Sequence, residues 1–237
     1  MDFVERFAEL VKNARNIVFF GGAGVSTESG VPDFRSVDGL YNQKFRFPPE
    51  TMLSRSFFDR HPEEFYDFYR DKMLPLDVQP NSVHLKLAEL ERQGKLRAVV
   101  TQNIDGLHQK AGSKVVHELH GSVLRNYCMC CRKFHPAEFI RDSEGIPRCS
   151  CGGIVKPDVV LYEEGLDEAV MDAAIRAISK CDLLIVGGTS LVVYPAAGLL
   201  HYFKGEHLVL INRDETPYDH MAELVIHDSL GKVFAQI

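Results

Sequence analysis

Paired cysteines are the residues of this chain whose spacing most directly predicts chemistry. Five of the six cysteines stand between Cys128 and Cys151, and the sixth, Cys181, precedes an apolar run. Zinc prefers four tetrahedral ligands, and two close pairs of thiolates can supply them. Clustered pairs favour metal ligation over a disulfide framework. We therefore predict one structural zinc, with Cys130 as a spare thiol and free buried cysteines as the alternative; the predicted ligands are Cys128, Cys131, Cys149 and Cys151.

A glycine loop, Gly22-Ala23-Gly24, follows the apolar run 16–20 and precedes an expected helix. In such loops the backbone N–H groups and the helix N-terminus can hold a pyrophosphate. Thr27 stands where a dehydrogenase fingerprint has its third glycine, and no strand ending in an acidic residue follows about twenty residues on. The loop therefore predicts a nucleotide-binding site, with a tight strand–helix turn as the alternative. Its departures from the dehydrogenase fingerprint argue against an enzyme that transfers hydride. Arg35 nearby suits phosphates, although it could equally form a salt bridge in its loop.

Polar side chains also follow three other apolar runs. They are Gln102, Asn103 and Asp105 after one run, Thr189 and Ser190 after another, and Asn212 after the last. Amides and carboxylates there could orient a small polar ligand, but Asn and Asp also favour local turns, so both interpretations stay open. Among the ten histidines, His120 lies outside any apolar periodicity, and a neutral imidazole near pH 7 is a competent general base. A structural histidine is the alternative.

The elements that must position these residues form a repeating pattern. Continuous apolar runs at 16–20, 97–101, 182–186, 207–211 and 223–227 alternate with helical stretches such as 83–93 and 167–179. Buried strands separated by helices predict an α/β fold with a doubly wound, Rossmann-like parallel sheet, whose ligands bind at the carboxyl ends of the strands. We expect residues 1–35, 81–124 and 158–237 to form this domain. Residues 36–80 should form a helical insertion, and residues 125–157 a small zinc-binding module.

Composition limits the class of protein. The 237 residues include 45% hydrophobic and 25% charged residues, which is typical of a globular protein. A formal net charge of −6 argues against direct nucleic-acid binding. Residues 183–200 carry no charge, but Gly187-Gly188 and Pro195 interrupt them, so we expect no membrane span. The first residues lack the order of a signal peptide, and the clustered thiols favour a reducing compartment, so we expect a cytoplasmic protein.

Five motifs together resemble one family. They are the stretch from Gly22 to Arg35 (GAGVSTESGVPDFR), Thr101–His108 (TQNIDGLH), His120-Gly-Ser, Gly187–Val193 (GGTSLVV) and Ile211-Asn-Arg. In this order, with the four cysteines between the third and fourth, they closely resemble the sirtuins over nearly the whole chain. The resemblance implies NAD as co-substrate and His120 as the general base acting toward the ribose hydroxyls, with Asn103 as a second catalytic residue. It implies a cofactor site formed by Gly22, Ala23, Gly24, Thr27, Asp33, Phe34, Arg35, Gln102, Asn103, Ile104, Asp105, His120, Gly188, Thr189, Ser190 and Asn212.

The same resemblance implies an activity. In sirtuins the acyl oxygen of a modified lysine attacks the ribose carbon as nicotinamide leaves, the acyl group passes to ADP-ribose, and free lysine is released. Acetyl-lysine peptides would pair by backbone with two segments, an arrangement that implies contacts from Val160, Leu161, Glu163, Leu191, Val192 and Val193. This chain reads Leu161-Tyr162-Glu163-Glu164 where family members commonly read Phe-Phe-Gly-Glu. An NAD-dependent ADP-ribosyltransferase and a non-catalytic NAD or ADP-ribose sensor are the alternatives.

The chain differs from one subgroup of sirtuins at a residue pair that determines which acyl group is removed. Sirtuins that remove succinyl groups carry a Tyr-x-x-Arg pair, but three residues after Tyr66 comes Tyr69, and the arginine, Arg70, is one residue further. In a helix this step turns the side chain by about 100°. We therefore expect acetyl and other neutral acyl groups to be preferred.

Overall fold

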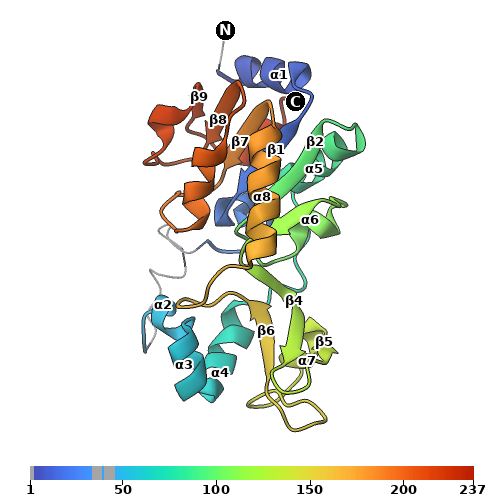
Figure 1. Ribbon diagram of the computed structural model, residues 1–237, viewed down its shortest axis with the longest axis vertical. Coiled ribbons are helices and arrows are strands. Elements are labelled where there is room, and N and C mark those ends of the chain that lie inside the picture. The colour runs from blue at the N-terminus through green and yellow to red at the C-terminus, as the bar shows by residue number, and fades with distance from the viewer. Residues whose placement is uncertain (1–2, 34–38, 40–45) are drawn as a thin grey trace.

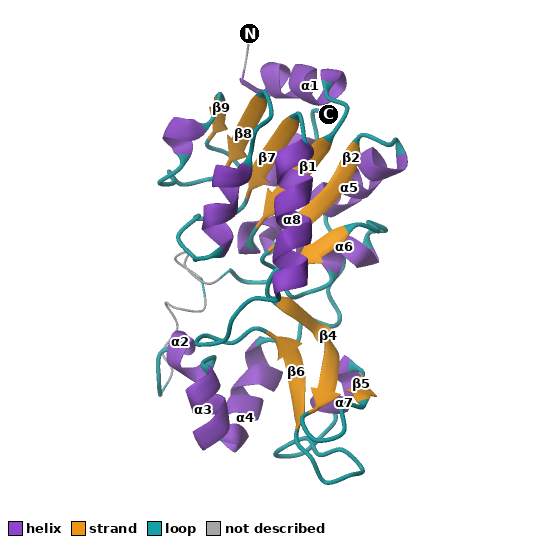
Figure 2. Cartoon of the chain, in the orientation of Figure 1, coloured by secondary structure: helices purple, strands orange, loops and turns teal. Residues whose placement is uncertain are grey.

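The computed structural model describes residues 3–33, 39 and 46–237 of the chain. Its main layer is a parallel sheet in the order β3-β2-β1-β7-β8-β9 (Figures 1 and 2). The register pairs Gly21 with both Thr101 and Gly187, and Gly187 with Ile211, so four strands end at the same edge. The strands are β1 (Ile17–Gly21), β2 (Leu96–Thr101), β3 (Val116–Glu118), β7 (Leu183–Gly187), β8 (His207–Ile211) and β9 (Leu224–Ile226).

Helices cover both faces of this sheet. Successive residues of a strand point to opposite faces, and both sets are apolar here. Ile17 and Phe19 pack on the face that is covered by α1 (Phe3–Asn13), α5 (Ser82–Arg92) and α9 (Leu230–Phe234). Val18 and Phe20 pack on the opposite face, under α8 (Glu168–Lys180) and the 3-10 helix η4 (Ala196–Tyr202). Because both faces are buried, the strands are apolar throughout rather than alternating. The α/β fold class and the doubly wound sheet are confirmed.

A second part of the molecule lies beyond the carboxyl edge of the sheet (Figure 1). It combines four helices with an antiparallel sheet in the order β5-β4-β6, and Phe65 and Tyr66 are wholly buried in their common core. The elements are α2 (Pro49–Met52), α3 (Arg55–Arg60), α4 (Pro62–Lys72), β4 (Gly121–Cys128), β5 (Phe134–His135), α7 (Ala137–Arg141) and β6 (Val155–Val159).

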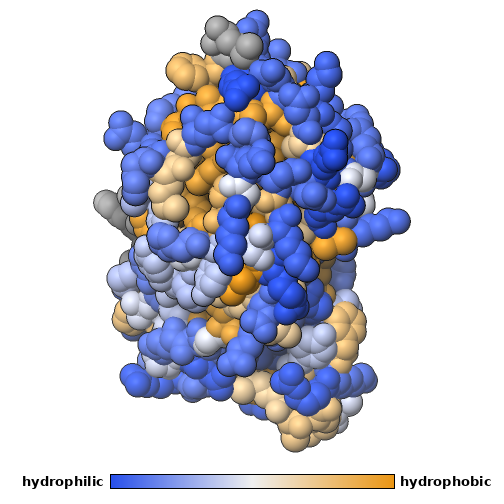
Figure 3. All heavy atoms as spheres, turned by 45° about the horizontal axis from the view of Figure 1, so that its top comes forward, coloured by the Kyte–Doolittle hydropathy of each residue, from blue (hydrophilic) through white to orange (hydrophobic). Residues whose placement is uncertain are grey.

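The remaining elements are short, and most of them lie in the loops that follow strands of the parallel sheet. The uncharged stretch 183–200 is divided into β7, a polar turn and the start of η4, as its glycines and proline predict. In the part of the chain that the structure describes, no helix is long and apolar enough to cross a membrane. On the face shown in Figure 3, hydrophilic residues surround smaller areas of apolar ones. The remaining elements are the 3-10 helices η1 (Ala23–Val25), η2 (Thr27–Ser29) and η5 (Asp219–Met221), and the helix α6 (Leu107–Lys110).

Candidate active site

A cavity of about 780 Å³ lies at the carboxyl edge of the parallel sheet, between the two parts of the molecule. The loops after β1, β2, β7 and β8 line one side of it, and residues 159–164, at the end of β6 and after it, line the other. This is the edge at which ligands bind in doubly wound sheets. The volume lies within the range of small-molecule and cofactor pockets.

The glycine loop forms one wall, and its glycines allow two loops to touch. A Cβ on Gly24 would lie 2.8 Å from the Cα of Gly188, and a Cβ on Gly188 would lie 2.6 Å from the backbone nitrogen of Val25. Gly188 also has a left-handed φ of 60°, which glycine adopts without steric cost. Side chains here would force the loops apart, so the glycines bring polar backbone to the edge of the cavity.

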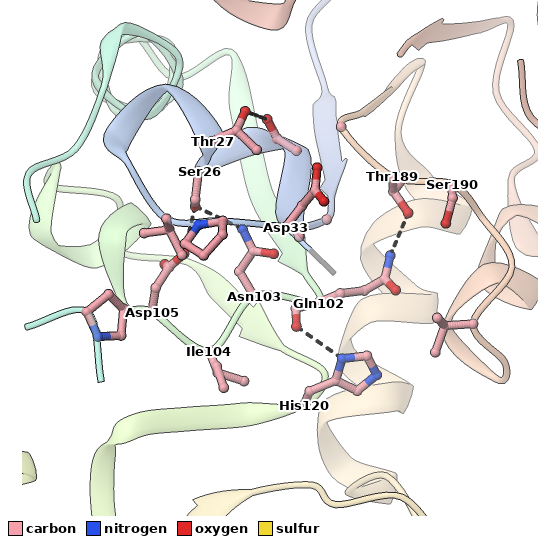
Figure 4. Close-up of a pocket in the computed structure, with 18 of the residues that line it drawn as sticks. Ser26, Thr27, Asp33, Gln102, Asn103, Ile104, Asp105, His120, Thr189 and Ser190 are labelled. Atoms are coloured by element: carbon pink, nitrogen blue, oxygen red, sulfur yellow. Dashed lines mark hydrogen bonds between the residues drawn. The ribbon is translucent and has the colours of Figure 1, made fainter. Parts of the chain in front are cut away.

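Ser26 connects the two polar residues of the loop after β2 (Figure 4). Its hydroxyl donates a 2.6 Å hydrogen bond to an oxygen of Asp105 and accepts one of 3.1 Å from the amide nitrogen of Asn103. The other oxygen of Asp105 accepts from the backbone N–H of Leu107 at 2.9 Å. Burial raises the pKa of Asp105, while the hydrogen bonds from Ser26 and Leu107 oppose that shift. This corner of the cavity therefore presents a fixed amide and a fixed carboxyl group.

His120 stands on the opposite side of the same loop, and one hydrogen bond fixes its ring. Its Nδ1 lies 3.0 Å from the carbonyl oxygen of Gln102 (Figure 4). Because a carbonyl oxygen only accepts, Nδ1 carries the proton of the neutral ring and Nε2 keeps its lone pair. Burial lowers the pKa of His120, and the bond to Gln102 partly opposes this. The Gln102 side chain donates to Thr189 Oγ1 at 3.0 Å, which ties the base to the loop after β7.

On two sides of the cavity, backbone N–H groups lack a hydrogen-bond partner among the described residues. The N–H of Glu163 on one side, and those of Val192 and Val193 on the other, donate to no group in the described parts of the chain. Tyr162 is already bound to the first turn of the helical segment, through Leu53 O and Arg55 N. An extended chain between these edges could pair with both.

The four predicted zinc ligands come together outside the cavity. The sulfurs of Cys128, Cys131, Cys149 and Cys151 all lie within 4.8 Å of one another. The Sγ atoms of Cys128 and Cys151 are 3.4 Å apart, and those of Cys131 and Cys149 are 3.7 Å apart. Tetrahedral ligands at the zinc–sulfur distance of about 2.3 Å lie roughly 3.8 Å from one another, so this cluster fits the ion. Cys130 is exposed and is not a member of the cluster.

Comparisons with known proteins assign the chain to a family. The Sir2 family model matches residues 22–195. The chain belongs to the Sir2 family. An NAD-dependent protein deacetylase of Clostridium perfringens is 61% identical over 240 residues, which cover 100% of this chain and 98% of that protein. One of Staphylococcus epidermidis is 46% identical, covering 99% of this chain and 96% of that protein.

Solved Sir2 structures agree with the fold. A Sir2 variant with a deacetylated p53 peptide and 3′-O-acetyl-ADP-ribose has a TM-score of 0.91 and 39% identity, over 98% of this chain and 96% of that one. A complex of Sir2 with a p53 peptide and NAD⁺ has a TM-score of 0.87 and 40% identity, over 100% of this chain and 97% of that one. The sirtuin resemblance of the sequence is therefore confirmed.

The structure brings most of the predicted site residues of this Sir2 protein to one cavity. Phe34 and Arg35 fall outside the described residues. Leu191 is 2% exposed and packs in the core under η4, and Val192 is exposed beside the cavity without lining it. Lining the cavity are Gly22, Ala23, Gly24, Thr27, Asp33, Gln102, Asn103, Ile104, Asp105, His120, Val160, Leu161, Glu163, Gly188, Thr189, Ser190, Val193 and Asn212.

Other residues of the cavity were not predicted. Ser26 stands within the glycine-loop motif, which was the signal available, but its role depends on a contact with Asp105, which is far away in sequence. Asp228, Ser229 and Leu230 also line the cavity, from the loop between β9 and α9. That stretch aligns only loosely with the family, so the sequence alone does not assign it, and the order of the strands brings it to the cavity.

Proposed function

We propose that this protein is an NAD-dependent protein lysine deacetylase that transfers the acetyl group of a modified lysine to ADP-ribose and releases nicotinamide. The observation that carries the proposal is one cavity with the fixed base His120 between the polar corner of Asn103 and Asp105 and an open peptide edge. Membership of the Sir2 family, with relatives named as NAD-dependent protein deacetylases, supports it.

The donor set fits NAD as co-substrate. Gly22 and Gly24 let their loop pack closely against the loop after β7, since a Cβ on Gly22 would lie 2.8 Å from Thr189 Cβ, and both glycines line the cavity, where their backbone could approach a pyrophosphate. Thr189, Ser190 and Asn212 offer hydroxyl and amide groups to a ribose, and Asn103 and Asp105 offer complementary groups to a carboxamide. When bound, NAD supplies a ribose carbon whose bond to nicotinamide can be broken. The protein binds and orients both reactants.

His120 acts as the general base in the proposed reaction. Its free Nε2 faces away from Gln102 and accepts a proton from a ribose hydroxyl, and its lowered pKa keeps the ring neutral near pH 7. The ring is half-buried in the wall of the cavity, so a bound cofactor would exclude more water from it and strengthen the hydrogen bonds around it. Asn103, held by Ser26, is proposed as the second catalytic residue because its side chain is fixed at the same loop.

The peptide would lie between residues 160–163 and 188–193, paired to both by β-augmentation. Val160, Leu161 and Val193 line the cavity there and would surround the modified lysine, while Leu191 and Val192 would contribute backbone groups. Acetyl-lysine-containing proteins are the proposed partners. Complexes of related Sir2 proteins with acetylated and propionylated peptides support peptides of this kind as partners.

The chain can be divided by role. We propose residues 1–35, 81–124 and 158–237 as the NAD-binding domain, residues 36–80 as the helical insertion, and residues 125–157 as the zinc-binding module. A reducing compartment such as the cytoplasm suits the four clustered thiols, which must remain thiolates to hold zinc.

The test is incubation of the purified protein with an acetyl-lysine peptide and NAD labelled in its adenylate part. We expect deacetylated peptide, free nicotinamide and labelled acetyl-ADP-ribose in equal amounts. Label on protein without need for the acetyl group would instead indicate an ADP-ribosyltransferase. NAD binding without turnover would indicate a sensor. His120→Ala should lower kcat by about a hundredfold or more, whereas His117→Ala, a histidine that does not line the cavity, should not.

A further inference from the structure

Glu163 adopts a backbone conformation that its side chain does not favour. Its φ is 75°, in the left-handed region that suits glycine, and only Arg132 and Leu191 share a positive φ among the other non-glycine residues that the structure describes. A Cβ in this region crowds the following carbonyl group, so a glutamate here is not explained by the turn itself. The side chain, rather than the backbone, must account for its presence.

The carboxylate of Glu163 is held in one place by helix α3. One oxygen accepts a 2.8 Å hydrogen bond from the N–H of Ser56, and the other accepts a 3.0 Å bond from its hydroxyl. Both donors are neutral, so they fix the group without cancelling its charge. The residue stays exposed at the edge of the cavity, which it lines.

The cations near Glu163 pair with other acidic residues and do not neutralise its charge. The next residue, Glu164, pairs with Arg55 and with Lys156, each at 3.1 Å. Arg55 also pairs with Asp59 at 3.0 Å. Both nearby cations are therefore engaged by other acids, and no ion pair to Glu163 occurs among residues 3–33, 39 and 46–237.

We propose that Glu163 selects substrates that carry a cationic residue close to the acetyl-lysine. The inference rests on the proposed function, because a peptide paired to the backbone of residue 163 brings its own side chains past this carboxylate. A fixed, exposed charge at the edge of a binding cleft favours a complementary charge and disfavours a like one. Arginine or lysine within a few positions of the acetyl-lysine is the chemistry that it recognises.

The experiment compares peptides that differ only in charge. In one neutral acetyl-lysine peptide, each of the three positions on either side of the acetyl-lysine is replaced in turn by arginine or by citrulline, its uncharged isostere. We expect at least one position at which kcat/KM for arginine exceeds that for citrulline by about threefold or more. This ratio should fall toward one in Glu163→Gln, and also in about 0.5 M NaCl, which screens exposed charges.

Two controls separate this role from a structural one. Glu144→Gln removes an equal charge from an exposed turn that does not line the cavity, and it should leave the ratio unchanged. If Glu163 served only to hold α3, then Glu163→Gln and Ser56→Ala would lower the melting temperature and leave the ratio as in the wild type. An arginine-to-citrulline ratio near one at every position, or a preference that survives in Glu163→Gln, overturns the proposal. If no peptide is deacetylated with NAD, the proposed function itself has failed, and the selectivity proposal fails with it.

Discussion

The base of the proposed reaction is defined by a single contact, from Nδ1 of His120 to the carbonyl oxygen of Gln102. That contact assigns the tautomer, and burial of the ring lowers its pKa below the ordinary value of 6.5. The neutral ring is the active form, so protonation removes activity as pH falls through the lowered pKa. We predict a kcat/KM that is level near pH 7 and falls with a midpoint below 6.5 in a pH series on one acetyl-lysine peptide.

One result of this measurement would contradict the prediction. An acid limb centred above 6.5 would mean that the ring is stabilised in its charged form, which a buried imidazole bonded only to a neutral carbonyl does not explain. Measuring kcat/KM rather than kcat reports the free enzyme, which is the state described by the structure.

Single residues also show what a sequence can and cannot reveal. Asn103, Asp105 and His120 could be selected from their motifs, because each motif stands directly after a strand or in a polar loop. The link from Ser26 to Asp105 could not, since 79 positions separate them and only the parallel pairing of β1 with β2 brings them together. Leu191 was expected at the substrate, but its side chain turns into the core.

At the scale of elements, helix α4 carries the tyrosine and the arginine on which the prediction about acyl groups depends. Tyr66 donates to Val155 O of β6 at 2.6 Å, and Arg70 donates to Gly145 O, in the loop after α7, at 2.8 Å. Neither lines the cavity, and Lys72, which does, is paired with Asp71 at 2.9 Å. A buried carboxylate without a cation is costly. We predict that kcat/KM for acetyl-lysine exceeds that for succinyl-lysine by about tenfold or more, since 1.4 kcal/mol gives that factor.

A butyryl-lysine peptide is the matched control for this prediction, because butyryl has the carbon length of succinyl without its charge. If size alone limited the site, butyryl and succinyl would be removed equally slowly. Equal or faster removal of succinyl than of acetyl would contradict the prediction.

The zinc-binding module is a second element whose role can be isolated. Cys149 is 4% exposed and belongs to the four-sulfur cluster, whereas Cys130 is exposed and lies outside it. Because binding of a structural zinc contributes to the stability of the fold, Cys149→Ser should lose the metal and lower the melting temperature by about 5 °C or more. Cys130→Ser should keep one zinc per chain and the wild-type melting temperature. Metal analysis with calorimetry measures both, and wild-type stability in Cys149→Ser would contradict a structural role.

The elements differed in how well the sequence predicted them. Five of the six strands of the parallel sheet were expected because each is a continuous apolar run, and the structure agrees to within a residue or two at their ends. Strand β3 has three half-buried residues, and β5 has two residues in all, so neither produces a recognisable period. Strand β4 runs from Gly121, before the expected start of the zinc-binding module, because its first residues pair with β6 rather than with the parallel sheet.

At the scale of the whole molecule, a buried histidine pair connects the helical layer to the cofactor loop. The rings of His84 on α5 and His108 on α6 lie 4.7 Å apart, and both residues are at most 1% exposed. His84 Nδ1 accepts from the N–H of Asn81, whose side chain donates to Val25 O at 2.8 Å beside the glycine loop. Burial lowers the pKa of His84 to about 4, and it lowers that of His108 well below the ordinary value, with the neighbouring His84 adding to the shift.

The sign of the resulting pH dependence follows from which state binds the proton. Unfolded histidine titrates near 6.5, while His84 in the folded protein titrates near 4, so the unfolded state binds more protons between these values. The contribution to stability is therefore complete above about pH 6.5 and is lost as pH falls toward 4. We predict a melting temperature several degrees lower at pH 5 than at pH 7. His84→Gln should reduce this difference, because glutamine can still accept from the N–H of Asn81 but does not titrate. Equal slopes of melting temperature against pH in the wild type and His84→Gln would show that the pair does not control acid stability.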